Sequence, residues 1–78
     1  MTKNYRIYDV GEEANVADRY TLINRHGNVF GFNENPYHPQ GFGQYAGEIA
    51  SLPGATKGEQ IAIEDLPEKA RKFVLERI

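Results

Sequence analysis

Six residues with side chains suited to recognition lie in one short stretch of this chain, which reads NPYHPQGFGQYAG over residues 35–47. They are Tyr37, His38, Gln40, Phe42, Gln44 and Tyr45. Aromatic rings give a large contact area at a low entropic cost, and the glycines among them let another backbone approach closely. We therefore predict that these residues form a binding surface for a protein partner, over 36–47.

Catalysis and metal binding are weaker interpretations of the same residues. His38 could act as a general acid or base, but no serine or threonine stands in a nucleophile motif near it. His26, His38 and Glu34 are ordinary zinc ligands by type, yet they show no ligand spacing, and the chain has no cysteine. The sequence predicts no catalytic residue, no metal site and no cofactor, and an enzyme is the less favoured class.

Two short patterns resemble known motifs in the wrong context. Gly41, Gly43 and Ala46 satisfy the relaxed dinucleotide-binding pattern, but that pattern should follow a buried strand and open a helix. Pro36 and Pro39 have the spacing of a proline-rich ligand, but no basic residue flanks them. Neither pattern is expected to carry function.

Composition and charge narrow the class of protein. The 78 residues predict one domain over 1–78, and the formal net charge of −2 is spread without a basic block. Nucleic acid is therefore not an expected partner. The N-terminal segment lacks the apolar run of a signal peptide, and no stretch approaches a membrane span. We expect a soluble, cytoplasmic protein that does not contact a membrane.

The elements that position the loop are predicted from hydrophobic patterns. A strand is expected over about 4–10 and a β-hairpin over about 18–33, with His26-Gly27 as its turn. This turn places Ile23 opposite Phe30, and slipping it by one residue would instead pair Arg25 with Phe30. In the preferred register, one face of the hairpin carries the side chains of Thr21, Ile23, Phe30 and Phe32. Tyr20, Leu22 and Val29 fall on the other face. Asp18 and Arg19 are expected to form structural ion pairs.

A long loop over 34–59, a strand over about 60–64 and a helix over about 66–78 complete the chain. Gln44–Leu52 could add a short helix or strand within that loop. Asp65 is predicted to accept hydrogen bonds from the first-turn amides of the helix. The apolar stripe on the helix consists of Ala70, Phe73, Val74 and Ile78.

The predicted fold is α+β, a mainly antiparallel sheet of three to four strands with a β-hairpin, a long ordered loop and one C-terminal helix. One helix covers one sheet face, so the other face needs a cover. The rings Tyr37, Phe42 and Tyr45 could provide it, which would make them core residues and not a recognition surface. A second copy of the chain could also cover this face, as a homodimer.

The chain resembles small uncharacterised proteins of bacteria and their phages. The resemblance is carried by Asp18-Arg19-Tyr20-Thr21, by Asn35-Pro36 with Pro39-Gln40-Gly41-Phe42 and Gln44-Tyr45, and by Glu64-Asp65-Leu66-Pro67-Glu68. It implies no named activity, cofactor or catalytic residue. By analogy with small proteins of phages and mobile elements, it favours binding to a larger component.

The function expected from the sequence is a small non-catalytic interaction module that contacts a protein partner through the 36–47 loop. The alternative is a small-ligand-binding domain or minimal enzyme with its site between loop and sheet, where His38 would be the acid or base. A third interpretation is a subunit that completes a larger assembly.

Overall fold

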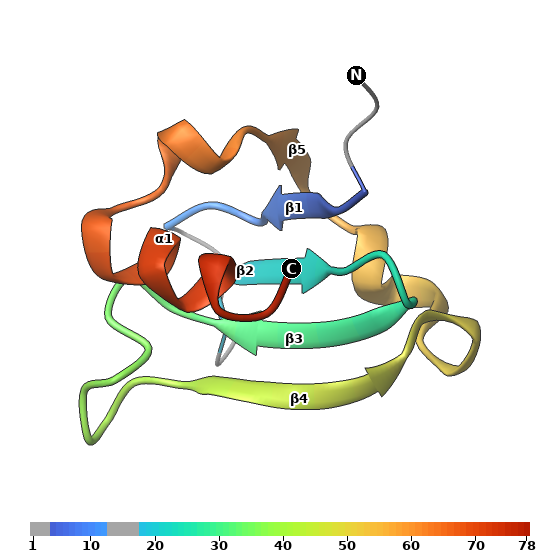
Figure 1. Ribbon diagram of the computed structural model, residues 1–78, viewed down its shortest axis with the longest axis horizontal. Coiled ribbons are helices and arrows are strands. Elements are labelled where there is room, and N and C mark those ends of the chain that lie inside the picture. The colour runs from blue at the N-terminus through green and yellow to red at the C-terminus, as the bar shows by residue number, and fades with distance from the viewer. Residues whose placement is uncertain (1–3, 13–17) are drawn as a thin grey trace.

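The computed structural model describes residues 4–12 and 18–78. Within these residues five antiparallel strands form one open sheet in the order β4-β3-β2-β1-β5, and one α-helix lies across a face of it (Figure 1). The strands are β1 (Arg6–Asp9), β2 (Tyr20–Ile23), β3 (Asn28–Phe32), β4 (Gly43–Glu48) and β5 (Glu59–Ile61). The helix is α1 (Glu68–Leu75), and three short 3₁₀ helices are η1 (Ile49–Ser51), η2 (Pro53–Thr56) and η3 (Ile63–Asp65). The α+β class is confirmed, whereas the prediction of three to four strands was too low.

The additional strand comes from the segment predicted as one long loop. Residues 43–48 of that segment form β4, which pairs with β3, so the irregular connection between these strands covers only 33–42. The predicted strand over 60–64 is shorter, because the chain turns into η3 directly after β5. The sequence predicted a short helix or a strand over Gln44–Leu52 without deciding between them, and the structure forms β4 and then η1 there. The burial of β4 does not alternate, so no strand pattern marks it.

The register predicted for the hairpin was wrong by one residue. The structure pairs Ile23 with Val29 and Leu22 with Phe30. A shift of one residue moves a whole strand's side chains to the other face, because successive residues of a strand point to opposite sides. Phe30 and Phe32 therefore lie on the face opposite Ile23, and not beside it.

The cause of the shift is a three-residue turn over 25–27. The backbone N–H of Asn24 donates a hydrogen bond to the backbone carbonyl of Asn28 at 3.0 Å. The backbone N–H of Gly27 donates one to the backbone carbonyl of Asn24 at 3.0 Å. Gly27 has φ of 78°, the left-handed conformation that this hairpin loop requires at its last position. The Asn24 side-chain oxygen also accepts hydrogen bonds from the amides of His26 and Asn28.

Helix α1 packs on the face of the sheet that carries the main core. Ala70, Phe73 and Val74 are buried, as the predicted stripe requires, and they pack with side chains from the three central strands. Ile78, the last member of the predicted stripe, is 42% exposed and lies beyond the helix end. The helix covers the middle of the sheet, while β4 runs along an edge beyond it (Figure 1).

The helix begins later than predicted, and Asp65 does not cap it. Pro67 occupies the N-cap position, and no side chain makes a cap hydrogen bond there. The Asp65 carboxylate instead accepts a hydrogen bond from the Ala62 amide at 3.1 Å, within η3. The carboxylate therefore stabilises the short turn that precedes the helix.

The opposite face of the sheet is covered by the segment 49–56 and not by the aromatic rings. Ile49, Leu52 and Ala55 pack against buried Tyr8, Ile23 and Val29 on that face. The interpretation in which Tyr37, Phe42 and Tyr45 form this cover was wrong, because all three are large exposed side chains. None of the helices within residues 4–12 and 18–78 could span a lipid bilayer.

Candidate functional site

The connection between β3 and β4 is a compact loop closed by its own backbone. The Asn33 amide donates a hydrogen bond to the Phe42 carbonyl at 3.0 Å, where the loop begins and ends. Inside the loop, the backbone N–H of His38 donates a hydrogen bond to the backbone carbonyl of Asn35 at 3.1 Å. The backbone N–H of Gly41 donates one to the backbone carbonyl of His38 at 2.8 Å. A Cβ atom at position 41 would overlap the Asn35 carbonyl oxygen. The path of the loop is therefore fixed by consecutive turns and by a glycine.

The loop is anchored to the helix through Pro36 and Tyr37. Pro36 is buried, and a Cβ atom at Gly43 would lie 2.6 Å from Pro36 Cβ and 2.7 Å from Phe73 Cε2. The Tyr37 ring contacts the Phe73 ring edge-on, with centroids 6.1 Å apart, and its hydroxyl hydrogen-bonds the Glu76 carboxylate. These contacts hold the loop against α1.

The six residues predicted as a binding surface are all exposed at their side chains. Tyr37, Phe42 and Tyr45 are 50%, 43% and 56% exposed. His38, Gln40 and Gln44 are exposed as well. The structure brings His38 and Gln40 together, because the Gln40 amide donates to His38 Nδ1 at 3.1 Å. Gln44 and Tyr45 are adjacent on β4 and so point to opposite faces of the sheet.

Tyr37 and Tyr45 lie at the two ends of a line of contacting side chains, which we call the ring row. It consists of Tyr45, Phe30, Arg77, Phe73 and Tyr37. The Tyr45 and Phe30 centroids are 5.6 Å apart, and the Arg77 guanidinium carbon lies 5.9 Å from the Phe30 centroid and 3.7 Å from that of Phe73. A cation over an aromatic face contributes about 0.5 to 2 kcal/mol. Sequence reasoning missed Phe30 and Arg77, since only the tertiary structure brings α1 beside β3.

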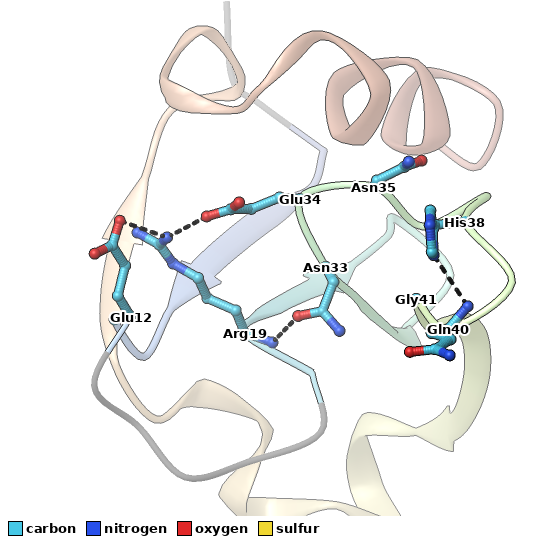
Figure 2. Close-up of a pocket in the computed structure, with 9 residues that line it drawn as sticks. Glu12, Arg19, Asn33, Glu34, Asn35, His38, Gln40 and Gly41 are labelled. Carbon is cyan, nitrogen blue, oxygen red and sulfur yellow. Dashed lines mark hydrogen bonds and ion pairs between the residues drawn. The ribbon is translucent and has the colours of Figure 1, made fainter.

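A hollow of about 430 Å³ lies beside the loop, and Arg19 lines it together with Glu12 and Glu34 (Figure 2). Arg19 binds Asp9 through two hydrogen bonds of 2.9 and 3.1 Å, and its Nη1 lies 2.7 Å from Glu34 and 3.5 Å from Glu12. The hydrogen bond from Arg19 lowers the pKa of Asp9, with a smaller contribution from the Gly11 amide. Three carboxylates thus surround one guanidinium, so this hollow is not suited to binding an anion.

A second hollow of about 560 Å³ lies between the loop and α1. Tyr37, His38 and Pro39 border it on the loop side, and Lys69 and Lys72 border it on the helix. The carboxylate in its wall, Glu76, is engaged by Tyr37. The loop therefore separates an acidic hollow from a basic one.

The residues of the candidate metal and nucleotide motifs do not have the arrangement in the structure that those motifs require. Among residues 4–12 and 18–78 no group of three or more histidine, cysteine, aspartate or glutamate side chains is placed to hold a metal ion. His26 lies in the hairpin turn and His38 in the loop, at opposite ends of β3. Gly41, Gly43 and Ala46 run from the loop into β4 and do not open a helix.

Comparisons with protein-family models, with curated proteins and with solved structures find no match. Function must therefore be inferred from the surface of this molecule.

Proposed function

We propose that this protein is a small non-catalytic interaction module that binds a protein partner through its 36–47 segment and the adjoining ring row. The observation that carries the proposal is the exposure of Tyr37 and Phe42 in a loop whose backbone is fixed, together with that of Tyr45 on the adjoining strand β4. Each of the three rings is more than two-fifths exposed. Exposed aromatic rings on a rigid support are typical of recognition surfaces, because little entropy is lost when they are bound.

Preorganisation of the rings supports the proposal. Tyr37 is held by the Phe73 ring and by Glu76, and Tyr45 is held by the Phe30 ring. A ring that is fixed before binding does not lose rotamer freedom in the complex. Tyr37 and Tyr45 thus have the properties of hot-spot residues, which are enriched in tyrosine.

The position of β4 adds a second kind of contact. It is an edge strand of six residues with the sequence GQYAGE, and its only charged residue is Glu48 at the end. An edge strand presents backbone amides and carbonyls that can pair with an extended segment of another chain. A partner that adds a strand to β4 would meet Tyr45 on one face and Gln44 on the other. A second copy of the chain could pair in the same way, and sedimentation across a concentration series would test that homodimer.

The test is a tagged pull-down from cell lysate with mass spectrometry, in which the native chain is compared with the Phe42→Ala, Tyr45→Ala double variant. Leu75→Ala is the matched control, because Leu75 is 58% exposed but lies on the helix. Each variant is first shown to be folded by its thermal midpoint. We expect a partner that the native chain and Leu75→Ala capture and the double variant loses. A partner that all three chains retain would contradict the proposal.

A small-ligand site beside His38 is the second candidate. The Asn35 side-chain oxygen is buried and has no hydrogen-bond partner, and Asn35 borders both the acidic and the basic hollow. A ligand with an amide group could donate a hydrogen bond to this oxygen. A fragment screen by NMR tests the candidate through the amides of His38 and Gln40. Fragments that leave those amides unshifted would remove it.

A further inference from the structure

The sheet carries a separate hollow on the face opposite α1. Its volume is about 330 Å³, and it lies between β2, β3 and β4 on one side and residues 51–55 on the other. Most of the side chains around it are apolar, including Val29, Ala46, Leu52, Pro53 and Ala55. This volume is at the lower end of the range for small-molecule sites, which begins at about 300 Å³. The hollow is therefore suited to a small ligand with an apolar body.

One carboxyl group lines this apolar hollow, and it belongs to Asp18. Its Oδ1 atom is buried and makes no hydrogen bond. The ion pairs of the described residues join Arg19 to Asp9, Glu12 and Glu34 and do not include Asp18. The ion pair expected for Asp18 is therefore not found among the described residues, whereas the one expected for Arg19 is. Burial raises the pKa of the Asp18 carboxyl, because desolvation disfavours its charged form.

Gly31 makes room for this carboxyl group. A Cβ atom at position 31 would overlap Asp18 Oδ2 and lie 2.9 Å from Asp18 Cγ. Any other residue on β3 at this point would push the carboxyl group away from the sheet. The absence of a side chain at Gly31 thus leaves the space over β3 that the Asp18 carboxyl group occupies, at the border of the hollow.

We propose that this hollow binds a small organic amine, with its ammonium group on Asp18 and its short apolar body against Val29 and Leu52. A buried acceptor without a partner is satisfied best by a donor that also carries positive charge. An ammonium group has three donors, and the hydroxyl groups of Thr21 and Ser51 also line the hollow. The apolar walls favour an aliphatic chain. This site lies on the opposite face of the sheet from the ring row and does not depend on the proposed function.

The experiment uses n-hexylamine as the probe, with hexan-1-ol and hexanoate as its neutral and anionic analogues. Each is titrated into the ¹⁵N-labelled full chain, and the amides of Gly31, Ala46 and Gly54 report binding. We expect the amine to saturate these shifts at a concentration about tenfold lower than the alcohol, since a charged hydrogen bond contributes about that factor. Hexanoate should bind more weakly than either.

Two variants separate the role of the carboxyl group from that of the hollow. Asp18→Asn should bind hexylamine and hexanol alike, whereas Glu64→Gln, which removes an exposed carboxylate on η3, should keep the native preference. Ala46→Leu should fill the hollow and weaken both probes, and it serves as the test if Asp18→Asn does not fold. Equal binding of amine and alcohol to the native chain would overturn the proposal. Shifts outside the hollow, or a preference retained in Asp18→Asn, would also overturn it.

Discussion

Arg19 holds the Asp9 carboxylate at both of its oxygens, with Nε 2.9 Å from Oδ1 and Nη2 3.1 Å from Oδ2. The two residues lie 10 positions apart, on β1 and directly before β2, so the pair joins the ends of two neighbouring strands. The Arg19 guanidinium carbon also lies 5.0 Å from the centroid of the Tyr20 ring. The guanidinium thus links the edge of the acidic hollow to the core.

Asp9→Asn should destabilise the fold by about 1 kcal/mol at neutral pH, because it removes the charge of a bidentate pair that is only partly exposed. Asp9 has a pKa below its usual 3.8 in the folded state, so its contribution is present above pH 3.8 and is lost as the pH falls through the folded pKa. Urea unfolding of native and variant chains across this range measures the difference. A difference that does not shrink below pH 3.8 would contradict the role of the charge.

The Asp18 carboxyl should give the opposite dependence on pH. Burial raises its folded pKa above 3.8, so the native state binds more protons than the unfolded chain between these two pKa values. Stability from this group is therefore present below pH 3.8 and is lost as the pH rises through the folded pKa. Asp18→Asn should be more stable than the native chain at neutral pH, with the gain vanishing in acid. Urea unfolding of both chains at neutral pH and below pH 3.8 measures this gain in the free energy of unfolding. An equal gain at the two pH values would show that it does not come from the titration of Asp18.

Gly43→Ala should destabilise the protein by about 1 to 3 kcal/mol, because the added Cβ would lie 2.6 Å from Pro36 and 2.7 Å from Phe73. Gly54→Ala is the control, since its Cβ would meet only Lys57 Cε at 3.6 Å, an ordinary contact. That control should be neutral or slightly stabilising. Thermal unfolding of both variants provides the comparison. Equal midpoints would show that the loop is not pressed against the helix at position 43.

Asn24→Ala should cost about 1 to 3 kcal/mol, since Asn24 is buried and its side chain makes three hydrogen bonds. Two are accepted from the amides of the hairpin turn, and one is donated to the Arg77 carbonyl at 3.2 Å. Asn4→Ala, at an exposed asparagine, is the matched control and should change little. The free energy of unfolding in urea is the measurement. A loss no larger than that of Asn4→Ala would mean that the turn forms without this side chain.

Parts of the fold that depend on local patterns could be predicted from the sequence. The hairpin region was recognised because β-rich runs flank a glycine, and the apolar spacing of Ala70, Phe73 and Val74 identified the buried side of the helix. β4 was predicted only as one of two alternatives, because Gln44–Leu52 was expected to add a short helix or a strand, and this segment contains most of β4 and all of η1. The Gly-Gln-Tyr-Ala-Gly run of β4 has no strand pattern, and it becomes a strand by pairing with β3.

For the candidate site too, features that depend on residue type could be predicted from the sequence, whereas contacts between elements could not. Ring content and glycine spacing led to the prediction of a binding surface over 36–47, because these features depend only on residue type. The partners of those rings, Phe73 for Tyr37 and Phe30 for Tyr45, could not be identified, since both contacts join different elements. Asp18 was predicted to form an ion pair, and it forms none among the described residues, because nothing in its sequence neighbourhood distinguishes a partly buried carboxyl group from an exposed one.

The sequence by itself determined that this chain forms a small α+β domain with one amphipathic helix and a loop rich in aromatic rings. Those properties follow from composition and from the periods of strand and helix, which neighbouring residues already contain. The hairpin register is set by a local turn, in which the Asn24 side-chain oxygen accepts hydrogen bonds from the backbone amides of His26 and Asn28, and the hydrophobic pattern did not reveal this turn. Tertiary structure decided that Arg19 is paired with three carboxylates, whereas Asp18 forms no ion pair with any of the described residues. Which charged side chains meet depends on contacts between segments that are distant in the sequence, as when Arg19 meets Asp9 and Glu34, and these contacts exist only in the folded chain.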